Sequence, residues 1–157
     1  MRGVRWLVSL LVLDAMLVVG GRSASAQANQ SCTIAVTPVA FGVYDVFAPG
    51  ALYSTGSVTY SCGQQVNTIT IWMSKGLGAT NNPRQMASGA NRLSYYLCQD
   101  ANCATLWGDA QYPSDYGPVG LNRNNRTATL YVYGKILPGQ DVPTGTYTDS
   151  ILVEIDF

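Results

Sequence analysis

Tyr147-Thr-Asp-Ser-Ile-Leu-Val-Glu-Ile-Asp-Phe157 is the stretch that most clearly indicates the fold, because its apolar and polar residues largely alternate. Apart from Asp149, one face of this segment would carry only large apolar residues: Tyr147, Ile151, Val153, Ile155 and Phe157. A period of two is typical of a β-strand with one buried face. We therefore expect a strand over Tyr147–Phe157. A sheet whose last strand has no successor also has an edge that another element must cover.

The rest of the chain reads as further strands separated by turns. Turn residues recur about every ten positions, and no segment has a convincing helical period. The expected strands are Cys32–Thr37, Gly56–Cys62, Thr68–Ser74, Leu93–Cys98, Ala104–Trp107 and Ala128–Lys135. The stretches 76–89 and 108–125 read as long exposed loops. The pattern predicts one all-β sandwich of about six or seven strands.

Residues 1–26 have the pattern of a secretory signal peptide. Two arginines precede an apolar stretch over Trp6–Val19, and the small residues Ala24-Ser-Ala26 form a cleavage site. The apolar stretch contains Asp14 and is shorter than the roughly 20 residues that a spanning helix needs. We expect cleavage that leaves residues 27–157 as one domain without a membrane span.

Charge and composition exclude several functions. The segment 1–26 contains three of the nine basic residues and one of the nine acidic residues. Its removal therefore leaves 9 − 3 = 6 basic and 9 − 1 = 8 acidic residues. No basic patch is left for nucleic acid or an anionic membrane. The absence of histidine excludes Ser-His-Asp and Cys-His nucleophiles. Asp109 and Asp115 lie in a loop, where aspartate commonly caps turns. We expect no catalytic residue and no cofactor.

Four cysteines in an exported chain predict two disulfides, for which three connectivities exist. Cys98 and Cys103 are close enough in sequence to close a hairpin tip, and this pairing leaves Cys32 with Cys62. Loop-closure entropy assigns roughly 3.5 kcal/mol to the longer bridge and about 2 kcal/mol to the shorter one. A zinc site is the alternative, but no histidine and no Cys-x-x-Cys pair is present.

Several short motifs follow one another in a specific order and spacing: Cys32–Tyr44 with its Phe41-Gly-Val-Tyr44 turn, Gly56–Cys62, Leu93–Leu97 with Leu106–Asp109, Tyr133–Ile136, and Pro143–Asp149. Together with the terminal apolar strand, they resemble the spore coat protein U domain family over nearly all of residues 32–157. Cys98 and Cys103 depart from the usual hairpin of that family and look like an added local disulfide.

The resemblance implies a bacterial protein that is secreted through the periplasm to a surface fibre or coat. It implies an incomplete immunoglobulin-like, pilin-type sandwich, as in archaic, Csu-type chaperone–usher pili, which support adhesion and biofilm formation. The implied partners are a periplasmic chaperone, an outer-membrane usher and a neighbouring subunit that supplies the missing strand by β-strand addition. The acceptor groove would be lined by Tyr147, Ile151, Val153, Ile155 and Phe157, and a chaperone would clamp the Phe157 carboxylate.

The segment before the first cysteine is short for a strand donor. After the expected cleavage, five residues precede Cys32 and span at most about 17 Å, whereas the eleven-residue terminal strand spans about 36 Å. We therefore expect an acceptor that does not donate in the ordinary way, either a minor or tip-like subunit or a free-standing coat protein. Two alternatives remain: a sandwich completed by the chain itself, and a secreted carbohydrate-binding module that uses Trp107, Tyr112 or Tyr116.

Overall fold

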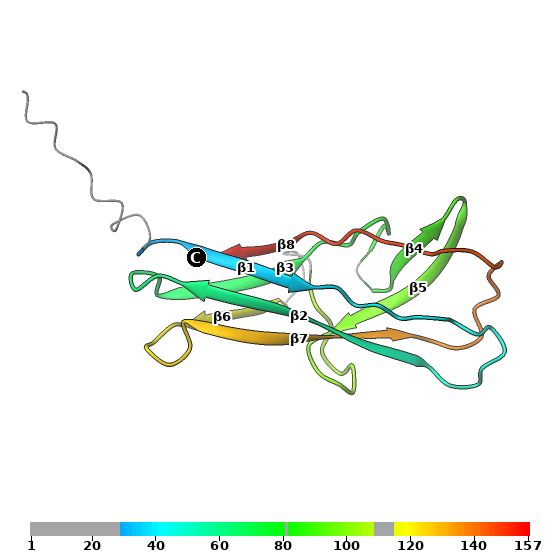
Figure 1. Ribbon diagram of the computed structural model, residues 1–157, viewed down its shortest axis with the longest axis horizontal. Coiled ribbons are helices and arrows are strands. Elements are labelled where there is room, and N and C mark those ends of the chain that lie inside the picture. Colours follow the sequence, from blue (N-terminus) through cyan, green and yellow to red (C-terminus); the bar gives the residue numbers. More distant parts are fainter. Residues whose placement is uncertain (1–28, 81, 109–114) are drawn as a thin grey trace, which may run out of the picture.

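The computed structural model describes residues 29–80, 82–108 and 115–157, and these residues form two antiparallel sheets. The strands are β1 (Cys32–Thr37), β2 (Leu52–Cys62), β3 (Thr68–Met73), β4 (Arg84–Ser88), β5 (Asn91–Cys98), β6 (Tyr116–Gly120), β7 (Thr127–Ile136) and β8 (Val153–Asp156). The larger sheet has the order β1-β2-β7-β5-β4 and the smaller one β6-β3-β8. Figure 1 shows most strands along the long axis of the sandwich. The all-β sandwich is thus confirmed, with eight strands in place of six or seven.

The core lies between the two sheets, where the period-two alternation of the strands places their apolar side chains. Ile69, Ile71 and Met73 of β3 are buried, whereas the residues between them are not. On β7, Val132 and Ile136 are buried in the same core. Both alternations follow the period of two that is typical of a strand with one buried face. Across the described residues, no helix is long and apolar enough to cross a membrane.

Two strands form inside segments that were expected to be loops. β4 lies within 76–89 and β6 within 108–125. β4 begins at Arg84, a charged residue that patterning would place at the surface but that is fully buried. Its guanidinium donates hydrogen bonds to the backbone oxygens of Ser74, Met73 and Trp107 at 3.0, 2.9 and 3.1 Å. β6 contains Pro118, and it is an edge strand, where proline is tolerated.

The expected strand over Ala104–Trp107 is wrong. Only Leu106 of this segment forms a bridge, which pairs it with Cys98 at the end of β5. The next residue, Trp107, leaves the surface, and its indole is 1% exposed. The segment therefore serves to bring a large aromatic side chain into the core.

The terminal strand is shorter than expected. Only Val153–Asp156 forms a continuous ladder, which pairs with β3. Upstream, Thr148 makes a single bridge to Ala87 of β4, in the other sheet. The segment thus passes from the edge of the larger sheet to the edge of the smaller one, and a chain that changes sheets cannot keep one ladder throughout.

Both expected disulfides are present. Cys32–Cys62 joins the first residue of β1 to the last residue of β2, which are direct partners in the strand register. Cys98–Cys103 closes the loop that follows β5. Within that loop, Asp100 accepts backbone hydrogen bonds from several residues, foremost Thr105 and Ala104, and these bonds hold the pKa of its carboxyl below the usual value.

Gly134 of β7 leaves room for the chain that follows β1. A Cβ atom at this position would lie 2.5 Å from Val39 Cγ1 and 2.6 Å from Phe41 Cζ. We expect Gly134→Ala to lower the free energy of unfolding by about 1–3 kcal/mol, because both side chains must shift. Urea unfolding measures this. Gly120→Ala is the matched control, since a Cβ at Gly120 meets no atom within 4 Å. Equal stability of the two variants would contradict the close packing.

Candidate functional site

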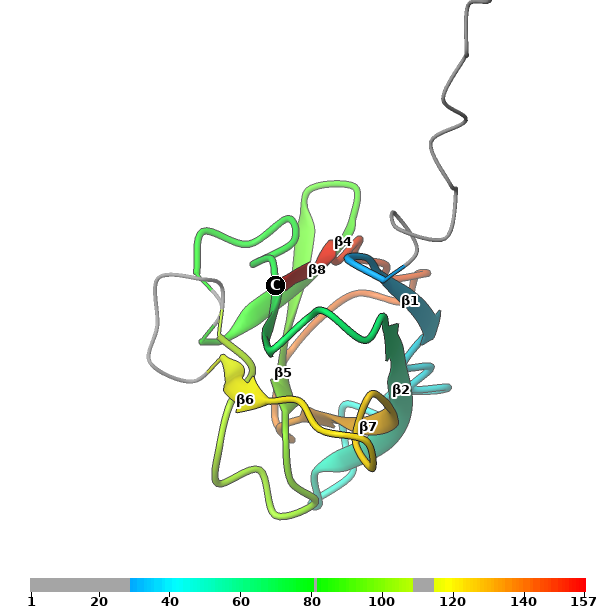
Figure 2. The same cartoon turned by 90° about the vertical axis from the view of Figure 1, so that its left-hand side faces the viewer.

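An open groove of about 860 Å³ runs between the two sheets. One wall is the chain from Val36 to Phe47, and the other is the segment 142–149 with Ile151 and Val153. Its floor is formed by core side chains of five strands: Val58, Met73, Met86, Leu93, Tyr95, Leu97, Val132 and Ile136. The edge strands β1 and β8 flank it, and in Figure 2 they lie near each other at the top of the ring of strands. Among the described residues, no backbone hydrogen bond joins β1 to β8.

The exposure of Val36 shows that the sandwich is open on the side of β1. It is the register partner of Val58 on β2, and partners across an antiparallel pair have their side chains on the same face. Val58 is 0% exposed, whereas Val36 is 54% exposed. The side chain of Val36 therefore lies on the inner face, and no neighbouring strand covers it.

Four of the five terminal residues that the sequence singled out pack against the core: Tyr147, Ile151, Val153 and Ile155. All four are only half-buried, and the first three of them line the groove. Phe157 differs, because its side chain is 60% exposed and does not pack against the core. The ladder of β8 ends at Asp156, so Phe157 lies beyond the last paired residue. The role of these residues in partner binding stays a prediction.

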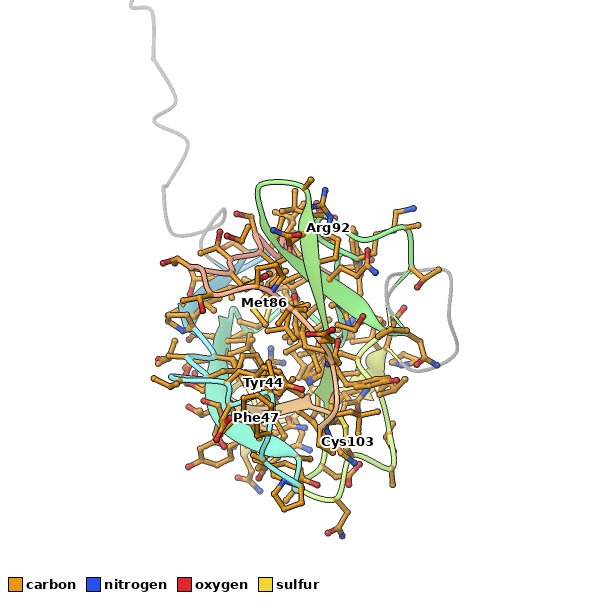
Figure 3. The ribbon with its side chains drawn as sticks, turned by 90° about the vertical axis from the view of Figure 1, so that its right-hand side faces the viewer. Tyr44, Phe47, Met86, Arg92 and Cys103 are labelled. Carbon is orange, nitrogen blue, oxygen red and sulfur yellow. A yellow bond between two sulfur atoms is a disulfide. The ribbon has the colours of Figure 1, made fainter. Side chains whose placement is uncertain are left out.

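The wall that follows β1 is held in place by specific contacts. Tyr44 donates a hydrogen bond to the Leu137 carbonyl at 3.0 Å and accepts one from the Gln140 amide at 3.0 Å. Gly42 has a φ of +73°, a left-handed conformation that glycine adopts readily. Phe41 packs edge-on against Tyr95 with ring centroids 5.9 Å apart. Figure 3 shows Tyr44 and Phe47 at the end of the sandwich nearest the viewer.

In the sequence, this wall belongs to the motifs that resemble a known family, and no site was expected there. Val36, Val39 and Phe41 all line the groove, yet only Val36 belongs to a strand. The apolar composition of the stretch after Cys32 was the available signal. It was incomplete because a chain that leaves a sheet no longer follows a period of two.

Asp149, the polar exception on the terminal apolar face, has partners inside the fold. Its carboxylate accepts hydrogen bonds from the Tyr95 hydroxyl at 2.7 Å and from the amides of Leu77 and Ser150 at 2.8 and 2.7 Å. Burial raises the pKa of Tyr95 well above its usual range, and the hydrogen bond to Asp149 raises it further. Among the described residues, Asp149 and Asp45 are the only acidic residues that line the groove, and no basic residue lines it.

The ionisation of Tyr95 should make the free energy of unfolding depend on pH in alkaline solution. Its folded pKa is raised above the unfolded value of about 10, so its contribution is present below pH 10 and is lost as the pH rises further. We expect Tyr95→Phe to lower the free energy of unfolding at pH 7 by about 1.5–3 kcal/mol, the usual range for hydrogen bonds to charged groups. The loss of stability above pH 10 should also become shallower. Burial raises the pKa of Tyr60 as well, so part of the dependence should remain. Identical pH profiles, measured by urea unfolding, would contradict this assignment.

One alternative from the sequence was a carbohydrate-binding site that uses Trp107, Tyr112 or Tyr116. Trp107 is a core residue, and half-buried Tyr116 packs on it with ring centroids 6.1 Å apart. Tyr112 and Asp109 lie outside the described residues. Among the residues with described positions, no group of three or more His, Cys, Asp and Glu side chains could hold a metal ion. The groove itself offers mainly apolar side chains and is flanked by two unpaired strand edges. Both features suit the binding of an extended peptide chain.

Three separate comparisons with known proteins each give a similarity. The family described as Spore Coat Protein U domain matches residues 20–154. "Protein U" of Myxococcus xanthus is 30% identical over 131 residues, which cover 74% of this chain and 70% of that protein. A chain in the crystal structure of the CsuC–CsuE chaperone–tip adhesion subunit pre-assembly complex, from archaic chaperone–usher Csu pili of Acinetobacter baumannii, has a TM-score of 0.56 at 20% identity. That similarity covers 81% of this chain and 40% of the other, and it establishes a shared fold.

Proposed function

The chain belongs to the Spore Coat Protein U domain family, and on that premise we propose that it is an exported structural subunit of a surface fibre or coat that accepts a β-strand from a partner protein. The open groove between the edge strands β1 and β8 is the observation that carries the proposal. An added strand would pair with a free edge by backbone hydrogen bonds. Its alternate side chains would cover apolar residues such as Val36 and Ile151.

The proposed occupants are first a periplasmic chaperone and then a neighbouring subunit, with an outer-membrane usher as the assembly site. The structure of similar fold is described as a chaperone–tip adhesion subunit pre-assembly complex, which supports partners of this kind. Export would depend on residues 1–26, which lie outside the described residues. A role in adhesion or biofilm formation at the cell surface belongs to the same proposal.

A structural role fits the groove better than a catalytic one. The two carboxylates that line it already bind within the fold: Asp149 accepts three hydrogen bonds, and Asp45 accepts one from the Phe47 amide at 2.9 Å. Among the described residues, no basic side chain lines the groove beside these carboxylates, so the general base that many hydrolytic mechanisms use is missing from this lining.

The decisive experiment is co-expression of the full chain with and without the periplasmic chaperone of its source bacterium, followed by amide hydrogen exchange. We expect the chaperone to protect amides in 36–47 and 142–153, the two walls of the groove. The central ladder between β2 and β7 is the internal control, because its amides are already paired in the free chain. N-terminal sequencing of the exported protein tests the cleavage expected after Ala26.

The proposal fails if the chain alone is a protease-resistant monomer whose groove amides are as protected as those of the β2–β7 ladder. That result would mean that the chain completes its own sandwich.

A further inference from the structure

The outer face of the five-stranded sheet gathers four tyrosines around one lysine. In the strand register, Lys135 of β7 lies between Tyr53 of β2 and Tyr96 of β5. Tyr133 and Tyr131 follow on β7 at alternate positions and therefore share the face of Lys135. The intervening residues of β7, Val132 and Gly134, point into the core, so these five side chains lie on the surface opposite the groove.

The tyrosine face presents two exposed aromatic rings and one half-buried lysine. Lys135 Nζ lies 5.7 Å from the centroid of the Tyr53 ring, a cation–π contact. Tyr131 and Tyr133 have ring centroids 6.4 Å apart. Tyr53 and Tyr131 are 55% and 59% exposed. No described carboxylate forms an ion pair with Lys135.

A pocket of about 290 Å³ adjoins the tyrosine face at Tyr96 and Lys135. Its other walls are Cys103, Ala104, Leu106 and Leu137. The bridge between Cys98 and Leu106 and the disulfide between Cys98 and Cys103 hold the loop that forms these walls. The Cys98–Cys103 disulfide therefore helps to shape the pocket beside Lys135, which is the only lysine in the five strands of the sheet.

The chemistry of the tyrosine face is aromatic, hydroxylic and positive. The five strands of the sheet contain no aspartate or glutamate. Beyond the tyrosines the face continues as threonines and serines, among them Thr59 and Thr129, whose hydroxyls share a hydrogen bond at 2.8 Å. Sugar rings present C–H groups that are attracted to the negative faces of aromatic rings. Lys135 makes a cation–π contact with Tyr53 but no ion pair with a described carboxylate, and such a lysine favours a ligand that carries a carboxylate.

We propose that the tyrosine face binds an acidic polysaccharide. Lys135 pairs with a carboxylate of the sugar chain, and the rings of Tyr53, Tyr96, Tyr131 and Tyr133 contact successive sugar rings. An acidic peptide would satisfy Lys135 as well. The tyrosine rings and the hydroxyls of the face fit a polymer that itself presents rings and hydroxyls. The pocket adds the aliphatic side chains of Ala104, Leu106 and Leu137. This site is separate from the groove and does not depend on strand addition.

The test measures binding of the full chain to polygalacturonate, with neutral dextran and poly-glutamate as comparison polymers. We expect binding to polygalacturonate that weakens with added salt. Lys135→Gln should reduce the affinity about tenfold and remove most of the salt dependence, because it deletes one charge-assisted contact. Lys135→Arg should retain binding. Lys75→Gln is the matched control, because it removes the same charge from an exposed loop outside this sheet.

Tyr131→Ala and Tyr131→Phe separate ring contact from hydroxyl contact. We expect the alanine variant to weaken binding and the phenylalanine variant to retain it, with the fold of every variant checked by its melting temperature. The proposal is overturned if polygalacturonate does not bind, or if Lys135→Gln and Lys75→Gln weaken binding equally. Equal affinity for poly-glutamate would also overturn it, since charge alone would then account for the binding.

Discussion

Val36→Asp is expected to leave the free chain folded and to weaken partner-strand binding by about 100-fold or more. In the free chain this side chain is 54% exposed, so a carboxylate there can stay hydrated, and stability should change by only about 0.5 kcal/mol. In the complex a donor strand would cover the position and leave an unpaired buried charge, which costs about 3 kcal/mol or more. Urea unfolding of the free chain and the fraction that co-purifies with the chaperone measure the two effects.

Leu152→Asp is the matched control for this prediction. Leu152 is 56% exposed and lies in the segment that forms the opposite wall, but it does not line the groove. The Leu152→Asp variant should therefore bind the partner as tightly as the wild type does. If both variants lose the partner equally, the groove is not the binding site. If neither loses it, the partner does not cover Val36.

Replacing Cys32 and Cys62 by serine together is expected to lower the free energy of unfolding by about 3.5 kcal/mol. The bridge spans a sequence separation of 30 residues, and its main effect is to restrict the unfolded chain. It also joins β1 to the rest of the larger sheet, and β1 has no second neighbour in that sheet. Loss of this bridge should therefore release the first wall of the groove and reduce partner binding as well.

The Cys98→Ser/Cys103→Ser variant is the comparison, because its bridge has a sequence separation of only 5. We expect a loss of about 2 kcal/mol and unchanged partner binding, since this loop lies outside the groove. Urea unfolding under non-reducing conditions compares both variants with the wild type. A larger loss for the short bridge than for the long one would contradict the loop-entropy account.

An open groove has consequences for the free chain. It leaves apolar side chains in contact with water and two strand edges without partners, and such edges promote association between copies. A partner strand that fills the groove would cover the apolar side chains and pair with a strand edge at the same time. The proposed function and the solubility of the chain are therefore linked through the same residues.

Several strands could be predicted because their signal is local. Strands were expected over Thr68–Ser74 and Ala128–Lys135, and the structure has them over Thr68–Met73 and Thr127–Ile136. Strand prediction failed for segments in which polar, charged and apolar residues do not alternate regularly. β4 begins with buried Arg84, whose burial depends on three backbone oxygens from β3, the turn after it and the Trp107 segment. No local pattern encodes partners so far away in the sequence.

The candidate site was only half visible from the sequence. Tyr147, Ile151 and Val153 were identified as an apolar face, and all three line the groove. The opposite wall was missed, because Val39 and Phe41 follow the end of β1 and pack against Gly134 of β7, a contact that no local pattern indicates. The tyrosine face was also missed, since its rings come from β2, β5 and β7 and meet only through the strand register.

By itself, the sequence determined the all-β class, the two disulfides, most strand positions and the apolar character of the last segment. Alternation and cysteine spacing are properties of neighbouring residues, and they survive without knowledge of the fold. Only the tertiary structure decided that the terminal segment passes from one sheet to the other and that an open groove separates it from β1. Whether a strand has a neighbour depends on how the whole chain packs, and the residues of that strand do not encode it.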